Sequence, residues 1–439
     1  MGAALIGCQP SPRAPAPKAP TPSVAAPAPP TEPAAVEPPP MIAAPPAAVA
    51  DAAPRPLRRC FDTVPVWVDA PVPDLLDRAE ALLQTDDAEG ALACAEEACR
   101  QAPRSVDAHQ DRASALLRLG RIEAAREAIT LVLAIAPTDP SSLLFAADLF
   151  INHLPATTER ASIGLEYVRR AGRSSAAFRA RSGLLEGQAL IDLGRAADAL
   201  RALTRALQEA KTSEAKVAIT YELGVAMFEL ARFSDAQARL AAVLEQEPNH
   251  AQAHFHMGLV LERAGEMELA EQHFAAATAA DATAFPPRVE VAADAFAEQV
   301  REAVSQLPGP MQESLRDVPV EAAELPTLED LTAESPPLSP TILGLFRGLP
   351  LGRVDDGVGV RLKNVRTTAG RGGVVGASVP PSPASFAIPE RGIVIYRRNL
   401  LRSVRGVAEV QPAIVRTLLH EAGHLLGEDD GSLRDRGLE

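Results

Sequence analysis

Two histidines and a glutamate near the C-terminus have the types and spacing of a metal site. His420 and His424 are four residues apart, so on a helix both imidazoles lie on one face and reach a single tetrahedral zinc ion. Glu421 follows the first histidine, where a carboxylate acts as general base toward the attacking water. The preceding run AIVRTLL is apolar and predicts a buried helix. The pattern predicts a catalytic zinc site, with two histidine ligands and a glutamate base.

A catalytic zinc ion needs a third protein ligand, and Asp430 is the strongest candidate. Metzincin enzymes have a histidine at this spacing and a later methionine turn, whereas this chain has Asp430 and no methionine after Met311. A turn at Gly427 would bring an aspartate three residues later back toward the histidines. The competing carboxylates are Glu428, Asp429, Asp355 and Asp356.

The C-terminal third of the chain resembles a known family. The signature HExxHxxGxxD of the small bacterial zincin-like metallopeptidases is matched by His420, Glu421, His424, Gly427 and Asp430. The strings FAEQVREAVSQLP, ILGLFRGLPL and IVIYRRNLL are similar to the opening helix, glycine-proline loop and last strand of that family. The resemblance implies a small α+β, minimal zincin-like domain over residues 287–439, with zinc as cofactor and a peptide substrate.

Three short apolar runs bounded by turn residues predict strands in this domain: VGVRLKNV, GGVVGASV and GIVIYRRNL. By analogy with zincins, the third strand would lie beside the metal-binding helix and pair with an extended substrate. Tyr396 on this strand is a candidate for assisting the oxyanion, although ordinary packing is the preferred interpretation. Arg397 and Arg398 are interpreted as a solvated strand end.

An internal period of 34 residues precedes this domain. Ala79, Ala113 and Ala147 follow it, as do Gly224 and Gly258. Small residues at these positions let the two helices of a pair approach closely. The period and the string EGALACAEEACRQAP resemble tetratricopeptide repeats, and about six units fit residues 72–284, the third with about five extra residues. The resemblance implies an all-α solenoid whose groove binds a protein or peptide partner.

The N-terminal string LIGC, which ends in Cys8, resembles the lipobox of bacterial lipoproteins. The resemblance implies a truncated signal over residues 1–8, lipidation of Cys8, and a periplasm-facing place in the bacterial cell envelope; a cytoplasmic location is the alternative. Residues 9–56 are rich in proline and alanine and predict a disordered linker. Residues 57–71 would lead from this linker into the repeats.

Composition narrows the class of protein further. A net charge of -14 argues against a nucleic-acid partner, because no basic stripe is present to neutralise phosphates. Apolar residues make up 47% and aromatic residues 4%, which favours packed helices. No run of about eighteen apolar residues predicts a transmembrane helix. In an oxidising compartment Cys60 could pair with Cys94 or Cys99, while free thiols fit the sequence equally well.

The sequence therefore predicts a multidomain protein that has a tetratricopeptide solenoid followed by a small zincin-like domain. Two functions compete. In the first, the protein is a zinc metallopeptidase whose water is activated by zinc and Glu421. In the second, it is a non-catalytic interaction lipoprotein with a structural or silent metal site. Glu421 favours the first, because a structural site needs ligands but no general base.

Overall fold

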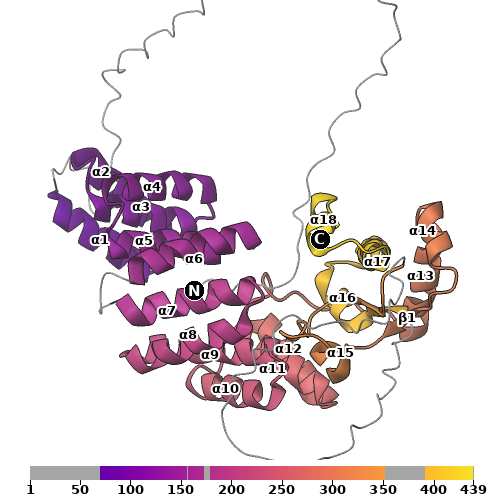
Figure 1. Ribbon diagram of the computed structural model, residues 1–439. Helices are drawn as coiled ribbons and strands as arrows, with labels where there is room; N and C mark the ends of the chain where they lie inside the picture. Colours follow the sequence, from indigo (N-terminus) through magenta and orange to yellow (C-terminus); the bar gives the residue numbers. More distant parts are fainter. Residues whose placement is uncertain (1–69, 156, 173–177, 352–390, 439) are drawn as a thin grey trace, which may run out of the picture. The chain divides into compact units, whose positions relative to one another are not determined.

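The computed structural model describes residues 70–155, 157–172, 178–351 and 391–438 of the 439-residue chain (Figure 1). The chain divides into two compact units, one ending at Ala136 and the other beginning at Pro137. Several predicted features lie outside the described residues: Cys8, Cys60, Asp355, Asp356, the linker 9–56 and the predicted strands VGVRLKNV and GGVVGASV.

Twelve consecutive helices in the described part of the chain form the six helix pairs that the 34-residue period predicts. Each odd-numbered helix packs against the even-numbered helix that follows it. The helices are α1 Val72–Gln84, α2 Ala88–Gln101, α3 Val106–Arg118, α4 Ile122–Ile135, α5 Pro140–Asp148, α6 Thr158–Gly172, α7 Arg179–Asp192, α8 Ala196–Glu209, α9 Ser213–Glu229, α10 Phe233–Gln246, α11 Ala251–Arg263 and α12 Met267–Ala280.

Small residues set how closely the helices of each pair approach. A Cβ atom added to Gly187 of α7 would lie 2.4 Å from Cγ of Leu203 in α8. The equivalent atom on Gly258 of α11 would lie 2.5 Å from Cε1 of Phe274 in α12. Both distances are far below van der Waals contact, so only glycine permits this packing. The predicted reason for the small residues is therefore present in the structure.

The third pair, which has the extra residues, contains a local change of helix type. Helix α5 continues into a π-helical segment, Leu149–His153, before the chain turns into α6. Gly164 of α6 packs against this segment, since an added Cβ would lie 2.5 Å from Cγ1 of Ile151.

The cysteines of the first repeat differ in state. Cys94 in α2 is fully buried and disulfide-bonded. Cys99 is a free thiol, partly buried, with its sulfur 3.4 Å from Nδ1 of His109. Burial raises the pKa of the Cys99 thiol, so it stays protonated at neutral pH.

The C-terminal domain is a small α+β unit. Its three-stranded sheet has the order β1-β3-β2; β1 pairs with β3 in parallel and β2 pairs with β3 in antiparallel fashion. A 3-10 turn at Val407–Glu409 leads into the longest helix of the domain. The elements are α13 Ala293–Gln306, α14 Gly309–Ser314, β1 Val320–Ala323, α15 Leu328–Thr332, β2 Gly344–Arg347, β3 Gly392–Tyr396, α16 Arg397–Ser403, α17 Val410–Leu425 and α18 Asp430–Asp435.

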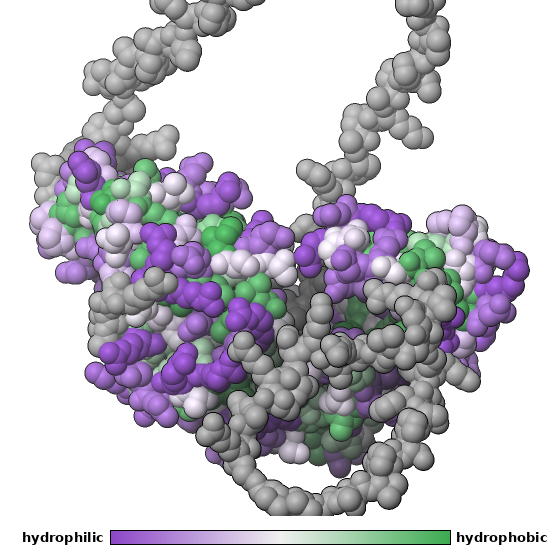
Figure 2. All heavy atoms as spheres, in the orientation of Figure 1, coloured by the Kyte–Doolittle hydropathy of each residue, from purple (hydrophilic) through white to green (hydrophobic). Residues whose placement is uncertain are grey.

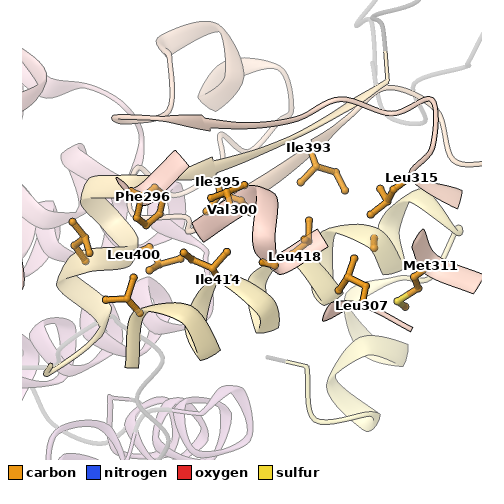
Figure 3. Packing of buried hydrophobic residues seen from close by; sticks show 14 of the residues in the cluster. Phe296, Val300, Leu307, Met311, Leu315, Ile393, Ile395, Leu400, Ile414 and Leu418 are labelled. Carbon is orange, nitrogen blue, oxygen red and sulfur yellow. The ribbon is translucent and has the colours of Figure 1, made fainter. Parts of the chain in front are cut away.

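The core of this domain lies between the sheet and two helices. Phe296 and Val300 of α13 and Leu307, which follows the helix, are buried on its inner side. In Figure 3 these side chains point toward Ile393 and Ile395 of β3 and toward the apolar stripe of α17. Burial of this shared stripe holds α17 against the central strand.

Two details of the domain correct the sequence-based interpretation. The run GIVIYRRNL is not a single strand, because β3 ends at Tyr396 and α16 begins at Arg397. Arg397 and Arg398 are consequently not a solvated strand end: their side chains are 18% and 20% exposed and form ion pairs. Strands β1 and β2 were not predicted.

Outside these cores the surface is mixed in polarity. On the face drawn in Figure 2, hydrophilic residues cover much of the described surface, with smaller apolar patches between them. Among the described helices, none is long and apolar enough to cross a membrane.

Candidate metal centre

Helix α17 carries the predicted metal site on one side and its core contacts on the other. Ile414, Leu418, Ala422 and Leu425 recur at helical spacing and are almost completely buried. The histidines lie on the neighbouring side of the helix and remain partly exposed, at 26% for His420 and 27% for His424. The apolar stripe therefore orients the helix so that both imidazoles face outward from the core.

The two histidines point their Nε2 atoms at each other, 3.1 Å apart. Their Nδ1 atoms are engaged elsewhere: His420 Nδ1 lies 2.7 Å from the carbonyl oxygen of Leu438, and His424 Nδ1 lies 3.0 Å from that of Glu428. A carbonyl oxygen only accepts, so each Nδ1 carries the proton and donates it. Both Nε2 atoms are consequently left with lone pairs directed at a common point.

This donor set fits a zinc ion. Two nitrogens held about 2.0–2.1 Å from a tetrahedral zinc are roughly 3.3 Å apart, close to the observed separation of the two Nε2 atoms. The carbonyl oxygens on the far side of each imidazole are the outer contacts that fix the tautomer and orientation of zinc-bound histidines. Among the described residues, His420, His424 and Asp430 are the one group of histidine, cysteine or acidic side chains with this convergence.

Asp430 completes the cluster from the chain that follows α17. Its Oδ1 atom lies 3.2 Å from Nε2 of His424 and 3.8 Å from Nε2 of His420. Gly427 has φ of +91°, and the N–H groups of Gly427 and Glu428 donate to the carbonyls of His424 and Gly423. These two bonds form a Schellman motif, in which glycine supplies the left-handed residue. The turn reverses the chain and returns Asp430 to the histidines.

The competing carboxylates near Asp430 are engaged elsewhere. Glu428 pairs with Arg436, at 2.7 Å between Oε2 and Nη1. Asp429 caps α18, because its Oδ1 accepts from the backbone N–H of Ser432 at 2.9 Å. The structure thus brings Asp430, rather than either neighbour, to the two histidines. Asp355 and Asp356 lie outside the described residues.

Helix α18 is held in place by close packing on α17. Leu433 is fully buried, and a Cβ atom added to Gly423 would lie 2.3 Å from its Cδ2. Gly423 occupies the position between the glutamate and the second histidine of the motif. Its lack of a side chain lets α18 lie directly on α17, which places Asp430 and the carbonyl of Leu438 at the site.

Glu421 lies beside the cluster and is held by strand β2. It is only 7% exposed, and its Oε2 accepts a hydrogen bond from the backbone N–H of Phe346 at 2.7 Å. Gly344 permits the close approach, since an added Cβ would lie 3.0 Å from Cγ of Glu421. Burial raises the pKa of Glu421 to about 7, although His420 and the Phe346 N–H act to lower it. A carboxyl group with a pKa near neutrality is suited to accepting and returning a proton.

One prediction about the neighbourhood of the site is wrong. The strand β3 is central and pairs on both sides, so it has no free edge for a substrate. Tyr396 is fully buried, and its hydroxyl donates to Oδ2 of Asp330 at 3.2 Å. Arg347 binds the same carboxylate through two nitrogens at 2.8 and 2.7 Å. The preferred interpretation of Tyr396 as a packing residue agrees with these contacts.

The comparison with known families agrees with this architecture. The sequence model of the zincin-like metallopeptidases matches residues 374–438, and that of the tetratricopeptide repeat matches residues 76–140, 184–231 and 221–285. No curated protein matches the chain. The protein is therefore a tetratricopeptide-repeat protein with a C-terminal zincin-like metallopeptidase domain. That domain implies a bound metal, usually zinc.

Solved structures match the helical repeats. A thermophilic tetratricopeptide-repeat protein of Thermus thermophilus is 20% identical, with a TM-score of 0.38, and the match covers 44% of this chain and 99% of that one. The Pseudomonas aeruginosa protein pilF is 13% identical, with a TM-score of 0.39, and the match covers 48% of this chain and 92% of that one.

Proposed function

We propose that the protein is a zinc-dependent peptide hydrolase in which His420, His424 and Asp430 hold the metal and Glu421 is the general base. The observation that carries the proposal is the convergence of three ligand atoms beside a buried carboxylate. A purely structural zinc site is usually closed by four protein ligands, whereas three ligands leave a position for substrate. The partly exposed histidines are consistent with such an open position.

Each residue of the site has a separate role in the proposed reaction. Zinc, when bound, supplies Lewis acidity that polarises a peptide carbonyl and makes water more acidic. Glu421 takes a proton from the attacking water and passes it to the leaving amine. The Phe346 N–H holds one oxygen of Glu421, so the other oxygen, Oε1, is left to accept the proton. The carbonyls of Leu438 and Glu428 keep the two imidazoles in the tautomer that binds metal.

Strand β2 is the proposed support for an extended substrate. It is an edge strand, and no other strand among the described residues pairs with its outer side. Its Phe346 N–H already faces Glu421, so the outer edge of β2 borders the proposed base. A peptide aligned with this edge would bring its backbone past the metal-binding helix. The groove of the helical repeats is proposed to bind a protein or peptide partner.

The decisive experiment measures bound zinc and peptide cleavage together. We expect wild-type protein to hold one zinc ion and to cleave casein or a peptide library, while Glu421→Gln holds zinc and is at least 100-fold slower. His420→Ala should lose both zinc and cleavage. The control is His254→Ala, which removes a repeat histidine whose Nδ1 lies 2.8 Å from that of His273. A wild-type protein without metal would overturn the proposal.

The rival function gives a different result in the same experiment. If wild type and Glu421→Gln both hold zinc and are equally inert across the library, the protein is an interaction module with a silent metal site. The presence of the buried Glu421 beside three candidate ligands argues for catalysis, because a structural site does not need a general base.

We further propose that Cys8 is lipidated and anchors the protein at the bacterial cell envelope. The LIGC string supports an anchor, and the disulfide at Cys94 fits an oxidising compartment. Mass analysis of the native N-terminus tests the anchor directly. An unmodified Cys8 in protein purified from its native membrane fraction would rule it out.

A further inference from the structure

The last helix pair shares a buried ion-pair cluster with the C-terminal domain. Glu262, near the end of α11, is 2% exposed. Its Oε1 accepts a hydrogen bond from Nη1 of Arg398 at 2.7 Å, and its Oε2 accepts one from Nη2 of Arg402. Both arginines belong to α16. A buried carboxylate is costly unless it is paired, so Glu262 fastens α16 to the repeats.

Other contacts reinforce this boundary. Arg263, the next residue of α11, donates to the carbonyl oxygen of Pro326 at 2.6 Å. The guanidinium of Arg402 also lies over the ring of Phe274 in α12, 5.1 Å from its centroid. Two helices of the repeats, α11 and α12, therefore contact the C-terminal domain.

A chain of hydrogen bonds leads from Glu262 into strand β2. Arg402 donates through Nη1 to Oδ1 of Asn399, at 3.3 Å. Asn399 is buried, and its Nδ2 donates to the carbonyls of Pro340 and Ile342 at 2.9 and 2.8 Å. Ile342 lies two residues before β2 begins. Asn399 therefore fixes the segment by which the chain enters this strand.

Strand β2 depends on such support. It has four residues and pairs with one neighbour only, and so short an edge strand is weakly held by its own hydrogen bonds. Yet it supplies the Phe346 N–H that binds Glu421 at 2.7 Å. Whatever fixes the entry to β2 thus also fixes the position of the proposed base.

We propose that Glu262 is a positioning residue for the metal centre: it anchors α16, and through Arg402 and Asn399 it holds the segment that sets Phe346 against Glu421. The last repeat is then a structural part of the hydrolase site, rather than a recruiting module that moves independently of it. The effect on turnover rests on the proposed function, while the effect on β2 does not.

The test uses Glu262→Gln in the full-length chain. Glutamine keeps the volume of the side chain but leaves Arg398 and Arg402 without their shared carboxylate. The matched control is Glu271→Gln, which removes a carboxylate at the same boundary; its side chain is 51% exposed and pairs with Arg288 at 2.8 Å. Glu262→Asp keeps the charge and loses volume, so it separates pairing from packing.

Two measurements are made on each variant. We expect hydrogen exchange of the Phe346 amide to be at least tenfold faster in Glu262→Gln than in wild type, with the control and Glu262→Asp much closer to wild type. In the cleavage assay, kcat of Glu262→Gln should fall at least tenfold with KM and zinc content unchanged, because misplacement of a catalytic group slows chemistry without removing binding.

Asn399→Ala provides a second test for the case that Glu262→Gln does not fold. Asn399→Ala removes the last link of the chain without leaving a buried charge, and we expect the same acceleration of exchange at Phe346. Unchanged exchange there in every folded variant, relative to Glu271→Gln, would overturn the inference. If exchange responds but wild type cleaves no peptide, the positioning stands and the proposed hydrolase function fails.

Discussion

The substitution Gly423→Ala tests whether α18 delivers the third metal ligand. The new Cβ would lie 2.3 Å from Cδ2 of Leu433, which is fully buried. Leu433 must retreat by roughly 1.2 Å to reach a carbon–carbon contact of about 3.5 Å. Asp430 begins the same short helix and moves with it. Metal ligands tolerate only about 0.2 Å of displacement, so Asp430 would leave the coordination sphere.

Two opposing effects decide whether Gly423→Ala stabilises or destabilises the metal-free protein. Replacing glycine within α17 favours the helix by about 1 kcal/mol. Displacing Leu433 forfeits part of the roughly 1.5–3 kcal/mol that its burial contributes. The metal-free protein should therefore change little in stability, or lose about 1 kcal/mol. Zinc affinity should fall by at least the roughly 10- to 100-fold typical of losing an outer contact, because Asp430 is proposed as a direct ligand.

The assay is a zinc titration in competition with a chromophoric chelator, combined with thermal unfolding of the metal-free protein. Gly431→Ala is the control, because it lies in the same short helix and its added Cβ meets only Oδ1 of Asp429 at an ordinary 3.5 Å. Equal zinc affinity in Gly423→Ala and Gly431→Ala would refute the role assigned to α18, even if both proteins fold normally.

Three further predictions concern other parts of the structure. Gly344→Ala should lower kcat at least tenfold with zinc retained, because its Cβ would lie 3.0 Å from Cγ of Glu421; an unchanged rate would contradict the contact. Removal of residues 436–439 takes away the Leu438 carbonyl that accepts from His420 Nδ1. Chelator competition should then show about 10-fold weaker zinc binding than in wild type. Equal zinc affinity would show that this carbonyl does not support the metal site. Burial raises the pKa of Asp192 to about 7, so the folded state binds its proton more tightly than the unfolded state. Stability should therefore fall as pH rises from 4 to 7, by up to about 4 kcal/mol, and Asp192→Asn should flatten this part of the profile in urea unfolding; an unaltered slope would contradict the burial of this carboxyl.

The helical repeats and α17 were predictable because their determinants are local or periodic. Ala79 and Ala113 mark the repeat by spacing alone, and both are fully buried where the period requires small residues. The same holds for the metal cluster, since His420 and His424 share a helical face whatever the rest of the chain does. Asp430 followed from a glycine turn, which the structure contains at Gly427.

The contacts of Glu421 were not predictable from the sequence for a physical reason. Its partner is a backbone N–H that lies 75 residues away, and every residue except proline has such a group. Strand β2 has only four residues, GLFR, too few for an alternating pattern to stand out from a loop. Glycine at position 344 was the available signal, because it marks a place where another element approaches closely.

The error at Arg397 and Arg398 has the same origin. The run after Tyr396 has no N-terminal capping side chain, so the local sequence contains no signal that α16 begins there. The helix places Arg398 and Arg402, which are four residues apart, on one face, where both bind the buried carboxylate of Glu262. Part of the support for the helix that follows the central strand thus comes from a carboxylate 136 residues away. The boundary between the repeats and the zincin-like domain is consequently part of the fold of each.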